Sequence, residues 1–376
     1  MNFEKLLPQA TVTLQESLGH SVVLSAPVVI KDWSRSLIVR CQVKSAESRI
    51  SSIIIKQIKA DAARGFSDWA SLAFLSELPD AQGIVPRFYG GDIPNRLFLM
   101  EDLGEGENLQ DTLNSPDPTA AYAALQTLAV QMARLHGATV EKQELFEAIR
   151  DSLPETNELG CHHEVTIWLE NREKISGWFR AVDYMPPPGF DLCLTHVANI
   201  YSRSEEFLGF THGDPAPSNN HFAQGQARLL DFEYGGFRHV LYDITAWDIL
   251  CPLPVNCMRG MSNSFREELM KTYPSARDER HFTEAWACLC AYRALAILTW
   301  IPLDIINQNR PWADNWTMRE AVLAAVSRLE RVTAPFAQLG AISEAAGILT
   351  KELRFRWPEF ESVDDVLPQW SALKNG

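Results

Sequence analysis

The sequence lacks the features that would place it in three common classes of protein. Its 34 Lys and Arg stand against 48 Asp and Glu, a formal net charge of −14, which disfavours general nucleic-acid binding because that needs clustered cations. The opening residues, MNFEKLLPQA, contain no basic region followed by a long apolar run, so we expect no signal peptide. The most apolar stretch, 287–306, is interrupted by Arg293, Pro302 and Asp304, which predicts a buried helix instead of a membrane span.

Cysteine is also scarce. The seven cysteines are an odd number and lack the spacing of a disulfide framework or a zinc site, so we expect reduced, mostly buried thiols. Together with the absences above, this predicts a cytoplasmic protein that binds neither membranes nor nucleic acid. Because 376 residues exceed the roughly 100–200 of one compact domain, we expect two lobes.

The first hundred residues favour strands. Strands are predicted for three β-branched runs separated by polar turns: 21–30, 36–43 and 51–59. In the second run, Leu37, Val39, Cys41 and Val43 recur at every second position, as one half-buried face requires. A helix is predicted to follow over 67–78, and a further strand over 96–101.

Beyond Pro118 the pattern becomes helical. Leu125, Leu128, Met132 and Leu135 recur at spacings of 3, 4 and 3, which is one apolar stripe of a helix. Further helices are predicted over 141–152, 162–182, 190–202, 280–300 and 317–338. We therefore predict an α+β fold of two lobes: a small antiparallel sheet with one helix over 1–100, a hinge over 101–107, and a larger, mainly helical lobe over 108–376.

Two short stretches carry polar residues suited to phosphoryl transfer. That reaction needs a carboxylate to accept the proton of the attacking hydroxyl, oxygen ligands for Mg²⁺ and a cation near the phosphate oxygens. In FTHGDPAPSNNHF (210–222), Asp214 and Asn219 are separated by four residues, the spacing of the kinase base and its metal-binding Asn. In LLDFEYGG (229–236), Asp231 opens DFE, where kinases carry a second metal-binding residue.

The pair of motifs HGDPAPSN and LDFEY resembles the aminoglycoside phosphotransferase and choline kinase superfamily, whose members have a protein-kinase-like fold. The DFEY form looks especially like choline and ethanolamine kinases. The resemblance implies that Asp214 is the catalytic base and that Asn219 and Asp231 bind magnesium. It also implies that His212 braces the loop.

Two further acids have less certain roles. Glu233 is either a direct or second-layer metal ligand or a partner of neighbouring backbone. Asp243, in YDITAW, is expected to bind loop backbone as a buried helix cap, with a direct role in the site as the alternative.

The small lobe of a kinase-like protein presents a Lys to the α and β phosphates. Lys56 directly follows the apolar part of its strand, whereas Lys59 lies at the end of the strand, so we favour Lys56. Its expected carboxylate partner on the next helix is Asp68 or Glu77. These two lie on opposite sides of the helix, and we choose Asp68, whose short side chain predicts a longer or water-bridged pair.

The segment LFLMEDLG resembles the family's hinge. The backbone of Glu101 to Leu103 would bond the adenine edge and Met100 would flank the ring, although Met100 is nearly as well explained as core.

One expected feature is missing. The loop that covers the phosphates usually contains glycine so that backbone N–H groups can approach, but KDWSRS (31–36) has none. The hydroxyls of Ser34 and Ser36, with Arg35, would serve instead.

The acceptor site is the least determined. Trp312, Asp314 and Trp316 combine aromatic faces with an acid, which suits a cationic group, although both tryptophans are equally typical of loop anchors. Arg238 would instead favour an anionic substrate. The two hints disagree about the charge of the acceptor.

Taken together, the sequence predicts an ATP- and Mg²⁺-dependent phosphotransferase that moves the γ-phosphate to a hydroxyl of a small molecule. The candidates are an amino alcohol such as choline or ethanolamine, an aminoglycoside, a sugar or an amino acid. The alternative is a catalytically weak pseudokinase or ligand-binding module on the same fold. A protein kinase is less favoured, because no APE-type segment follows DFE.

Overall fold

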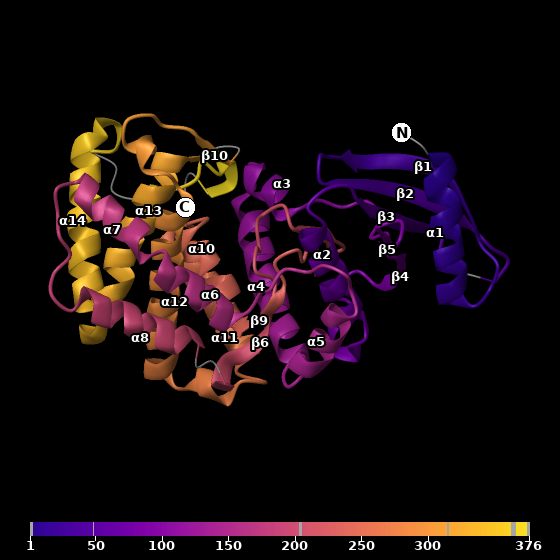
Figure 1. The fold of residues 1–376 in the computed structure, drawn as a ribbon, viewed down its shortest axis with the longest axis horizontal. Helices are drawn as coiled ribbons and strands as arrows, with labels where there is room; N and C mark the ends of the chain where they lie inside the picture. Colours follow the sequence, from indigo (N-terminus) through magenta and orange to yellow (C-terminus); the bar gives the residue numbers. More distant parts are fainter. Residues whose placement is uncertain (1–2, 48, 203–204, 314–315, 362–365, 374–376) are drawn as a thin grey trace. The chain divides into compact units, whose positions relative to one another are not determined.

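The computed structural model describes residues 3–47, 49–202, 205–313, 316–361 and 366–373. The chain forms two compact units, coloured along the sequence in Figure 1. The first comprises 1–108, 138–158 and 212–236, and the second 109–137, 159–211 and 237–376. The lobe boundaries expected from the sequence stay a prediction. Each compact unit is defined by contacts between residues, so it combines segments from three parts of the chain.

The first unit is built on a five-stranded antiparallel sheet with the order β1-β2-β3-β5-β4. Its strands are β1 (Val23–Asp32), β2 (Ser36–Lys44), β3 (Ser52–Ile58), β4 (Phe88–Asp92) and β5 (Leu97–Glu101). The three predicted β-branched strands and the strand near 96–101 are all present. The predicted alternation is also confirmed, since Leu37, Val39 and Cys41 are buried and Val43 packs on the same core.

Helix α1 (Phe3–Leu18) covers one face of this sheet and was not predicted. Its buried residues Leu6, Ala10 and Leu14 are spaced by four and join the core formed by the sheet. Pro8 lies inside this helix, and a proline in a helix interior normally argues against one. Packing of the apolar stripe against the sheet outweighs that local preference.

Helix α2 (Ala62–Ser76) also packs against the sheet; it begins before the predicted segment 67–78 and ends two residues short of its end. Trp69 contacts Phe66, Phe88 and Phe98 and lies so close to Gly91 that a Cβ there would overlap its ring at 2.1 Å. The helix is therefore fixed in rotation by a large ring on one side. The first unit also contains α5 (Gln143–Asp151) and the hairpin of β7 (Asn220–Ala223) and β8 (Gln226–Leu229).

The second unit is mainly helical. Its elements are α3 (Leu109–Asn114), α4 (Pro118–Ala138), α6 (Cys161–Glu170), α7 (Arg172–Ala181), α8 (Phe190–Ser202), β6 (Leu208–Thr211), β9 (Gly236–His239), α9 (Leu241–Ile244), α10 (Ala246–Ile249), α11 (Val255–Leu269), α12 (Glu279–Trp300), β10 (Pro311–Ala313), β11 (Trp316–Thr317), α13 (Met318–Thr333) and α14 (Gly340–Arg356). Strands β6 and β9 pair with each other, as do β10 and β11.

Most predicted helices are present in the second unit. The stripe of α4 is buried, with Leu125, Leu128, Met132 and Leu135 all at most 1% exposed. The single helix expected over 162–182 is instead two, because the chain leaves helical geometry at Asn171 (φ −84°, ψ 8°). The apolar stretch near 290 is the buried helix α12, and no described helix is long and apolar enough to cross a membrane. The fold class is thus α+β, as predicted.

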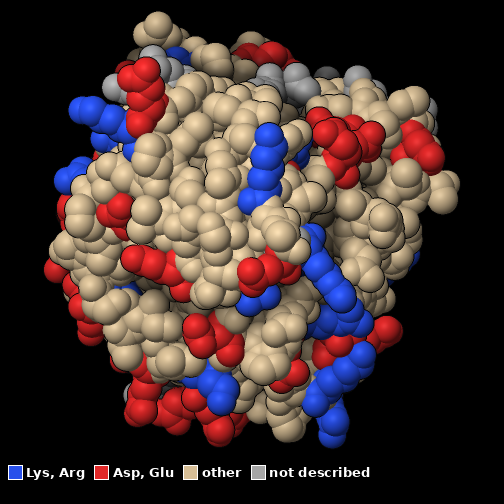
Figure 2. All heavy atoms as spheres, turned by 90° about the vertical axis from the view of Figure 1, so that its right-hand side faces the viewer, with Lys and Arg blue, Asp and Glu red and all other residues tan. Residues whose placement is uncertain are grey.

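Charged side chains are spread over the surface. On the face shown in Figure 2, acidic and basic side chains are interspersed, and large areas between them carry neither charge.

Candidate active site

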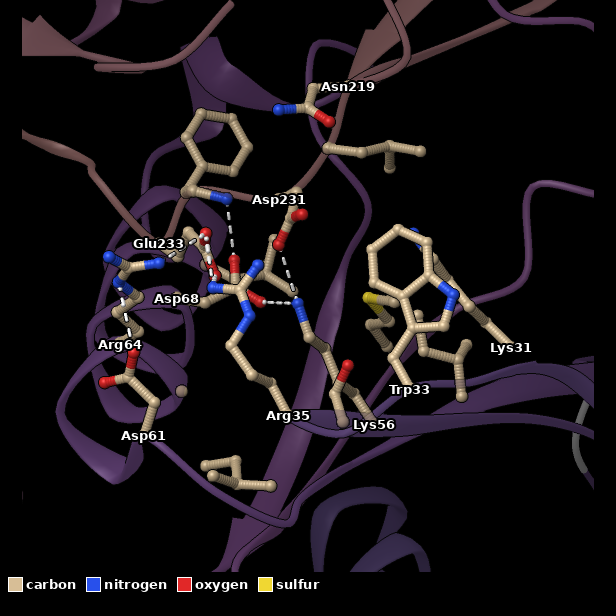
Figure 3. Close-up of a pocket in the computed structure, with 18 of the residues that line it drawn as sticks. Lys31, Trp33, Arg35, Lys56, Asp61, Arg64, Asp68, Asn219, Asp231 and Glu233 are labelled. Carbon is tan, nitrogen blue, oxygen red and sulfur yellow. Dashed lines mark hydrogen bonds and ion pairs between the residues drawn. The ribbon is translucent and has the colours of Figure 1, made fainter. Parts of the chain in front are cut away.

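A pocket in the first unit gathers charged side chains from the sheet, α2 and the segments around 219 and 231 (Figure 3). Its lining includes the predicted residues Lys56, Asp68, Asn219, Asp231 and Glu233. These positions are up to 177 residues apart in the chain, counting from Lys56 to Glu233. The structure therefore brings together most of the polar residues that the two motifs and the third strand contributed.

Lys56 lies on the pocket face because of strand alternation. Ile53 and Ile55 of β3 point into the core under α1, so the intervening positions Ile54 and Lys56 face the opposite side. The amino group donates to Asp68 Oδ2 at 2.7 Å and to Asp231 Oδ1 at 2.8 Å. Burial opposes its charge, but the two carboxylates outweigh this and raise the pKa of Lys56. The lysine is therefore held charged at pH 7.

Asp68 is the carboxylate that α2 directs at Lys56. Its Oδ1 accepts a hydrogen bond from Phe232 N at 2.7 Å, so one side chain links β3, α2 and the DFE segment. The contact with Lys56 is direct, and the expected longer or water-bridged pair was wrong because α2 approaches the strand closely. Glu77, the other candidate, is exposed at the C-terminal end of α2.

Asp231 adopts a left-handed backbone conformation, with φ +66°. This region is sparsely populated for residues other than glycine, although Asp tolerates it better than most. The neighbouring bonds Leu230 N to Asn219 O (3.0 Å) and Phe232 N to Asp68 hold the chain on both sides of it. The conformation aims the carboxylate at Lys56 and into the pocket.

The loop before this segment places Asp214 beside Asn219. Asn219 Nδ2 donates to the Asp214 carbonyl at 3.0 Å and approaches its Oδ2 at 3.5 Å. Gly213 has φ +85°, and a Cβ there would lie 2.1 Å from the Tyr234 carbonyl oxygen. The loop therefore approaches the DFEY backbone at a distance that only glycine allows. Asp214 itself is exposed at the rim, next to a lining residue.

His212 is buried under this loop. Its Nε2 donates to the Leu230 carbonyl at 2.8 Å, and its ring packs on Phe232 with centroids 4.6 Å apart. The imidazole thus joins the HGD loop to the DFE segment.

The donor set of Asn219 and Asp231 fits a magnesium ion. Hard oxygen ligands from one or two side chains, completed by phosphate and water, are what Mg²⁺ normally takes. The Asn219 side-chain nitrogen donates to the Asp214 carbonyl, so the side-chain oxygen Oδ1 is the atom that could bind a metal ion. Ser218 Oγ lies 3.3 Å from this oxygen. The Asp231 side chain is 37% exposed although one of its oxygens binds Lys56. Within the described residues, no cluster of three His, Cys, Asp or Glu side chains forms a ready-made metal cage.

Glu233 is paired with the turn between β1 and β2. Arg35 Nη1 donates to both of its carboxylate oxygens, at 3.0 and 3.1 Å, and Arg64 lies 3.9 Å away. Burial and the nearby Asp231 raise the pKa of Glu233, while Arg35 opposes the shift. The acid therefore ties the turn to the DFE segment.

Only some of the predicted nucleotide-contacting residues line the pocket. Within the described chain, the pocket lining includes Met100 and Ser36 but not Glu101, Leu103 or Ser34. Glu101 N donates to the Arg87 carbonyl at 2.8 Å, so its backbone amide bonds the segment just before β4.

The remaining predicted residues belong to the second unit. Asp243 is buried in α9, with one carboxylate oxygen 3.7 Å from His136 Nε2. Trp316 is 6% exposed in β11, just before α13, whereas Trp312 in β10 is 36% exposed. Arg238 is buried and donates to Glu164 Oε1 from Nε at 2.7 Å. Asp314 lies outside the described residues.

Two cations of the pocket were not singled out from the sequence. Lys31 at the end of β1 and Arg64 on α2 both line it. The register could have identified Lys31, because it pairs with Ile38, which in turn pairs with Lys56. Cross-strand partners share a face, but the register is set by the turn and was not known.

Comparisons with known proteins agree with this geometry. The family model described as the phosphotransferase enzyme family matches residues 61–273, more than half of the chain. No protein of curated function was matched.

Solved structures are matched at low identity. They include a choline/ethanolamine kinase family protein from Mesorhizobium loti, at 13% identity and a TM-score of 0.45, covering 87% of this chain and 93% of that one. A macrolide 2′-phosphotransferase from Brachybacterium faecium matches at 12% identity and a TM-score of 0.46, covering 78% and 92%. A choline kinase from Streptococcus pneumoniae matches at 12% and 0.44, covering 92% and 100%.

Proposed function

Because the chain belongs to the phosphotransferase enzyme family, we propose that it transfers the γ-phosphoryl group of ATP, with Mg²⁺, to a hydroxyl of a small molecule. The acceptors that the sequence allows are amino alcohols such as choline or ethanolamine, aminoglycosides, sugars and amino acids. The proposal is more specific than the family, which establishes phosphotransfer by a kinase-like enzyme and leaves the donor and the acceptor open.

The observation that carries the proposal is the contact of one lysine with two carboxylates inside the pocket. Lys56 donates to Asp68 at 2.7 Å and to Asp231 at 2.8 Å, and Asn219 lines the same pocket. The first carboxylate is buried and holds the lysine, whereas the second is half-open to solvent. An ammonium group held by one buried and one partly exposed carboxylate is suited to bind phosphate oxygens on its partly exposed side.

The reaction would proceed by displacement at phosphorus. The acceptor oxygen forms a bond to the γ-phosphorus, and the bond from phosphorus to the β,γ-bridging oxygen breaks, so ADP leaves. The proton of the acceptor hydroxyl passes to the carboxylate of Asp214, which sits at the exposed rim and is held through Asn219. Lys56 offsets the negative charge on the phosphate oxygens.

Asn219 and Asp231 would hold the magnesium ion. When bound, Mg²⁺ neutralises phosphate charge and orients the oxygens. This chain's own part is to position the oxygen donors, and the strained φ of Asp231 and the loop bond from Leu230 to Asn219 do so. His212 and Glu233 support the segments that carry these residues, Asp243 would be a buried structural residue of the second unit, and Trp312, Trp316 or Asp314 would contribute to the acceptor side.

The test is a coupled ADP-release screen over amino alcohols, aminoglycosides, sugars and amino acids. We expect one class to stimulate Mg²⁺-dependent ADP formation above the basal rate. Asp214→Asn has nearly the same shape, so it should keep ATP affinity while turnover falls by about 10²–10⁴-fold, the usual contribution of a general base.

Two results would contradict the proposal. An Asp214→Asn variant with normal turnover would remove the assigned base. ATP binding without turnover for any hydroxyl compound would favour the binding module over the enzyme.

A further inference from the structure

The turn between β1 and β2 is too short and too well bonded to cover phosphates as a flexible glycine loop does. Trp33 N donates to the Ser36 carbonyl at 2.9 Å, which closes the hairpin. The Arg35 carbonyl accepts from Lys59 N at 2.8 Å and from Ala60 N at 3.2 Å. The backbone is therefore held against β3, and any phosphate contact from this turn has to come from side chains.

Four cations line the pocket: Lys31, Arg35, Lys56 and Arg64. Three of them already have carboxylate partners, since Arg35 binds Glu233, Lys56 binds two acids, and Arg64 Nε lies 3.2 Å from Asp61. Lys31 forms no ion pair within the described part of the chain. It is thus the pocket cation whose charge is left for a ligand.

Lys31 also lies on the same face of the sheet as Lys56. It pairs across the sheet with Ile38, and Ile38 pairs with Lys56, so the two lysines flank one isoleucine on the same face. The Lys31 amino group lies 3.1 Å from the centroid of the Trp33 ring. This cation–π contact restricts the side chain, which would otherwise sample many rotamers. Figure 3 shows Trp33 and Lys31 beside each other at the edge of the pocket.

We propose that Lys31, held by Trp33, is the phosphate-binding residue of the glycine-free turn and contacts the terminal phosphates of the bound nucleotide. This inference rests on the proposed use of ATP. An ammonium group binds phosphate as a compact point charge, which replaces the backbone N–H groups that a glycine loop would offer.

The electrostatic setting supports this role. Burial lowers the pKa of Lys31, and so do the nearby charges of Lys56 and Arg35, while Asp231 opposes them. A cation in such a place is stabilised by any anion that approaches. A nucleotide phosphate would supply that anion.

The experiment measures binding of ATP, ADP, AMP and adenosine to the full chain by calorimetry in the presence of Mg²⁺. We expect Lys31→Met to weaken ATP binding by about ten- to a hundredfold, the effect of losing a hydrogen bond to a charged group. The loss should shrink from ATP to AMP and vanish for adenosine. Lys31→Arg should recover most of the ATP affinity.

The matched control is Lys59→Met. Lys59 carries the same charge just after the end of β3, pairs with Asp32, and does not belong to the pocket lining within the described residues. Equal losses in the two variants would overturn the inference, because they would reflect net charge alone. Equal losses for ATP and adenosine in Lys31→Met would also overturn it, because they would reflect a change in pocket shape.

Trp33→Leu tests the positioning role separately. We expect it to weaken ATP binding by about two- to fivefold, to leave adenosine binding unchanged, and to add nothing in the Lys31→Met background. Additive losses would show that Trp33 acts independently of Lys31. If the wild-type chain binds none of the four ligands, the proposed function itself is wrong; if it binds them and Lys31→Met does not matter, only this inference is wrong.

Discussion

Each compact unit contains a buried cation paired with at least one carboxylate, and the two sites differ in how far their partners reach solvent. In the first unit, Lys56 bridges Asp68 and Asp231, and the Asp231 side chain is 37% exposed. In the second unit, Arg238 is 1% exposed, and it donates to Glu164 and to Thr211 Oγ1 at 2.9 Å. One site has a partner that reaches solvent, as the proposed ligand binding requires, whereas the cation of the other is enclosed.

The aromatic neighbours strengthen this difference. The Tyr201 hydroxyl donates to Glu164 at 2.5 Å, and the Arg238 guanidinium lies 5.0 Å from the Tyr242 ring centroid. Each nitrogen of the Arg238 guanidinium thus donates to a protein group, which is the arrangement of a structural ion pair. Both cations sit in strands, and they differ in residue type, in partners and in the exposure of those partners; these differences separate the proposed binding site from the closed ion pair.

The most direct test of this difference between the two sites is to replace each cation by methionine. Lys56→Met should lower turnover by about 10²–10³-fold, as the loss of one charge-stabilising donor does. Its effect on stability should be the smaller one, because Asp231 reaches water and Asp68 keeps the Phe232 N–H. Arg238→Met should instead destabilise the protein by about 3–5 kcal/mol, because Glu164, whose side chain is only 14% exposed, loses its charge partner and Thr211 Oγ1 loses its donor.

Urea unfolding and steady-state rates on the same two preparations give the measurement. Adding Glu164→Leu to Arg238→Met should recover part of the stability, since the unpaired charge is gone. A larger stability loss for Lys56→Met than for Arg238→Met would reverse the distinction between the two sites.

A second prediction concerns the backbone that positions the open site. Gly213→Ala and Gly225→Ala both place a Cβ at positive φ, +85° and +75°. A Cβ at Gly213 would lie 2.1 Å from the Tyr234 carbonyl oxygen, whereas a Cβ at Gly225 would have nothing within 4 Å. We expect about 1 kcal/mol of destabilisation for Gly225→Ala and clearly more for Gly213→Ala, with a fall in turnover for Gly213→Ala alone.

Chemical denaturation measures the stability loss of the two variants, and the ADP-release assay measures their turnover. Equal stability losses in the two variants would mean that the HGD loop and the DFEY segment are not in close contact. The Gly225 variant, at the tip of the β7–β8 hairpin, controls for the intrinsic cost of the left-handed conformation.

The smallest predicted effect is the pH dependence of stability that arises from His239 in the second unit. His239, next to Arg238, is buried, stacks on Phe207 and accepts a bond from Leu241 N at Nδ1. Burial, with His281 and His136 nearby, lowers the pKa of His239 to about 3. The unfolded chain has an ordinary value of about 6.5, so it binds this proton first as the pH falls. Stability from this residue is present above pH 6.5 and is lost toward pH 3.

The slope expected from this one group is about 1 kcal/mol per pH unit below 6.5. His239→Asn keeps an acceptor near Nδ1 but cannot titrate. The free energy of unfolding of this variant, measured from pH 7.5 to 5.0, should therefore fall less steeply than that of the wild type. Parallel slopes would show that His239 is not held neutral in the fold.

Local patterns account for what could be predicted. The alternation of Leu37, Val39 and Cys41 and the stripe of α4 follow from the periods of a strand and a helix. The four-residue spacing of Asp214 and Asn219 and the DFE segment belong to short, contiguous stretches. Helix α1 could not be predicted in the same way, because Pro8 weakens the local signal and only packing on the sheet restores it.

The sequence by itself determined the polar residues of the two motifs, the strand that carries Lys56 and the family to which they point. Only the tertiary structure decided which partners these groups take. Arg35 meets Glu233 across 198 positions of the chain, and Lys31 joins the pocket through the register of β1 on β2. Periodicity is local and can be read from neighbours in sequence, whereas the pairing of distant charges depends on strand register and chain closure, which exist only in the folded protein.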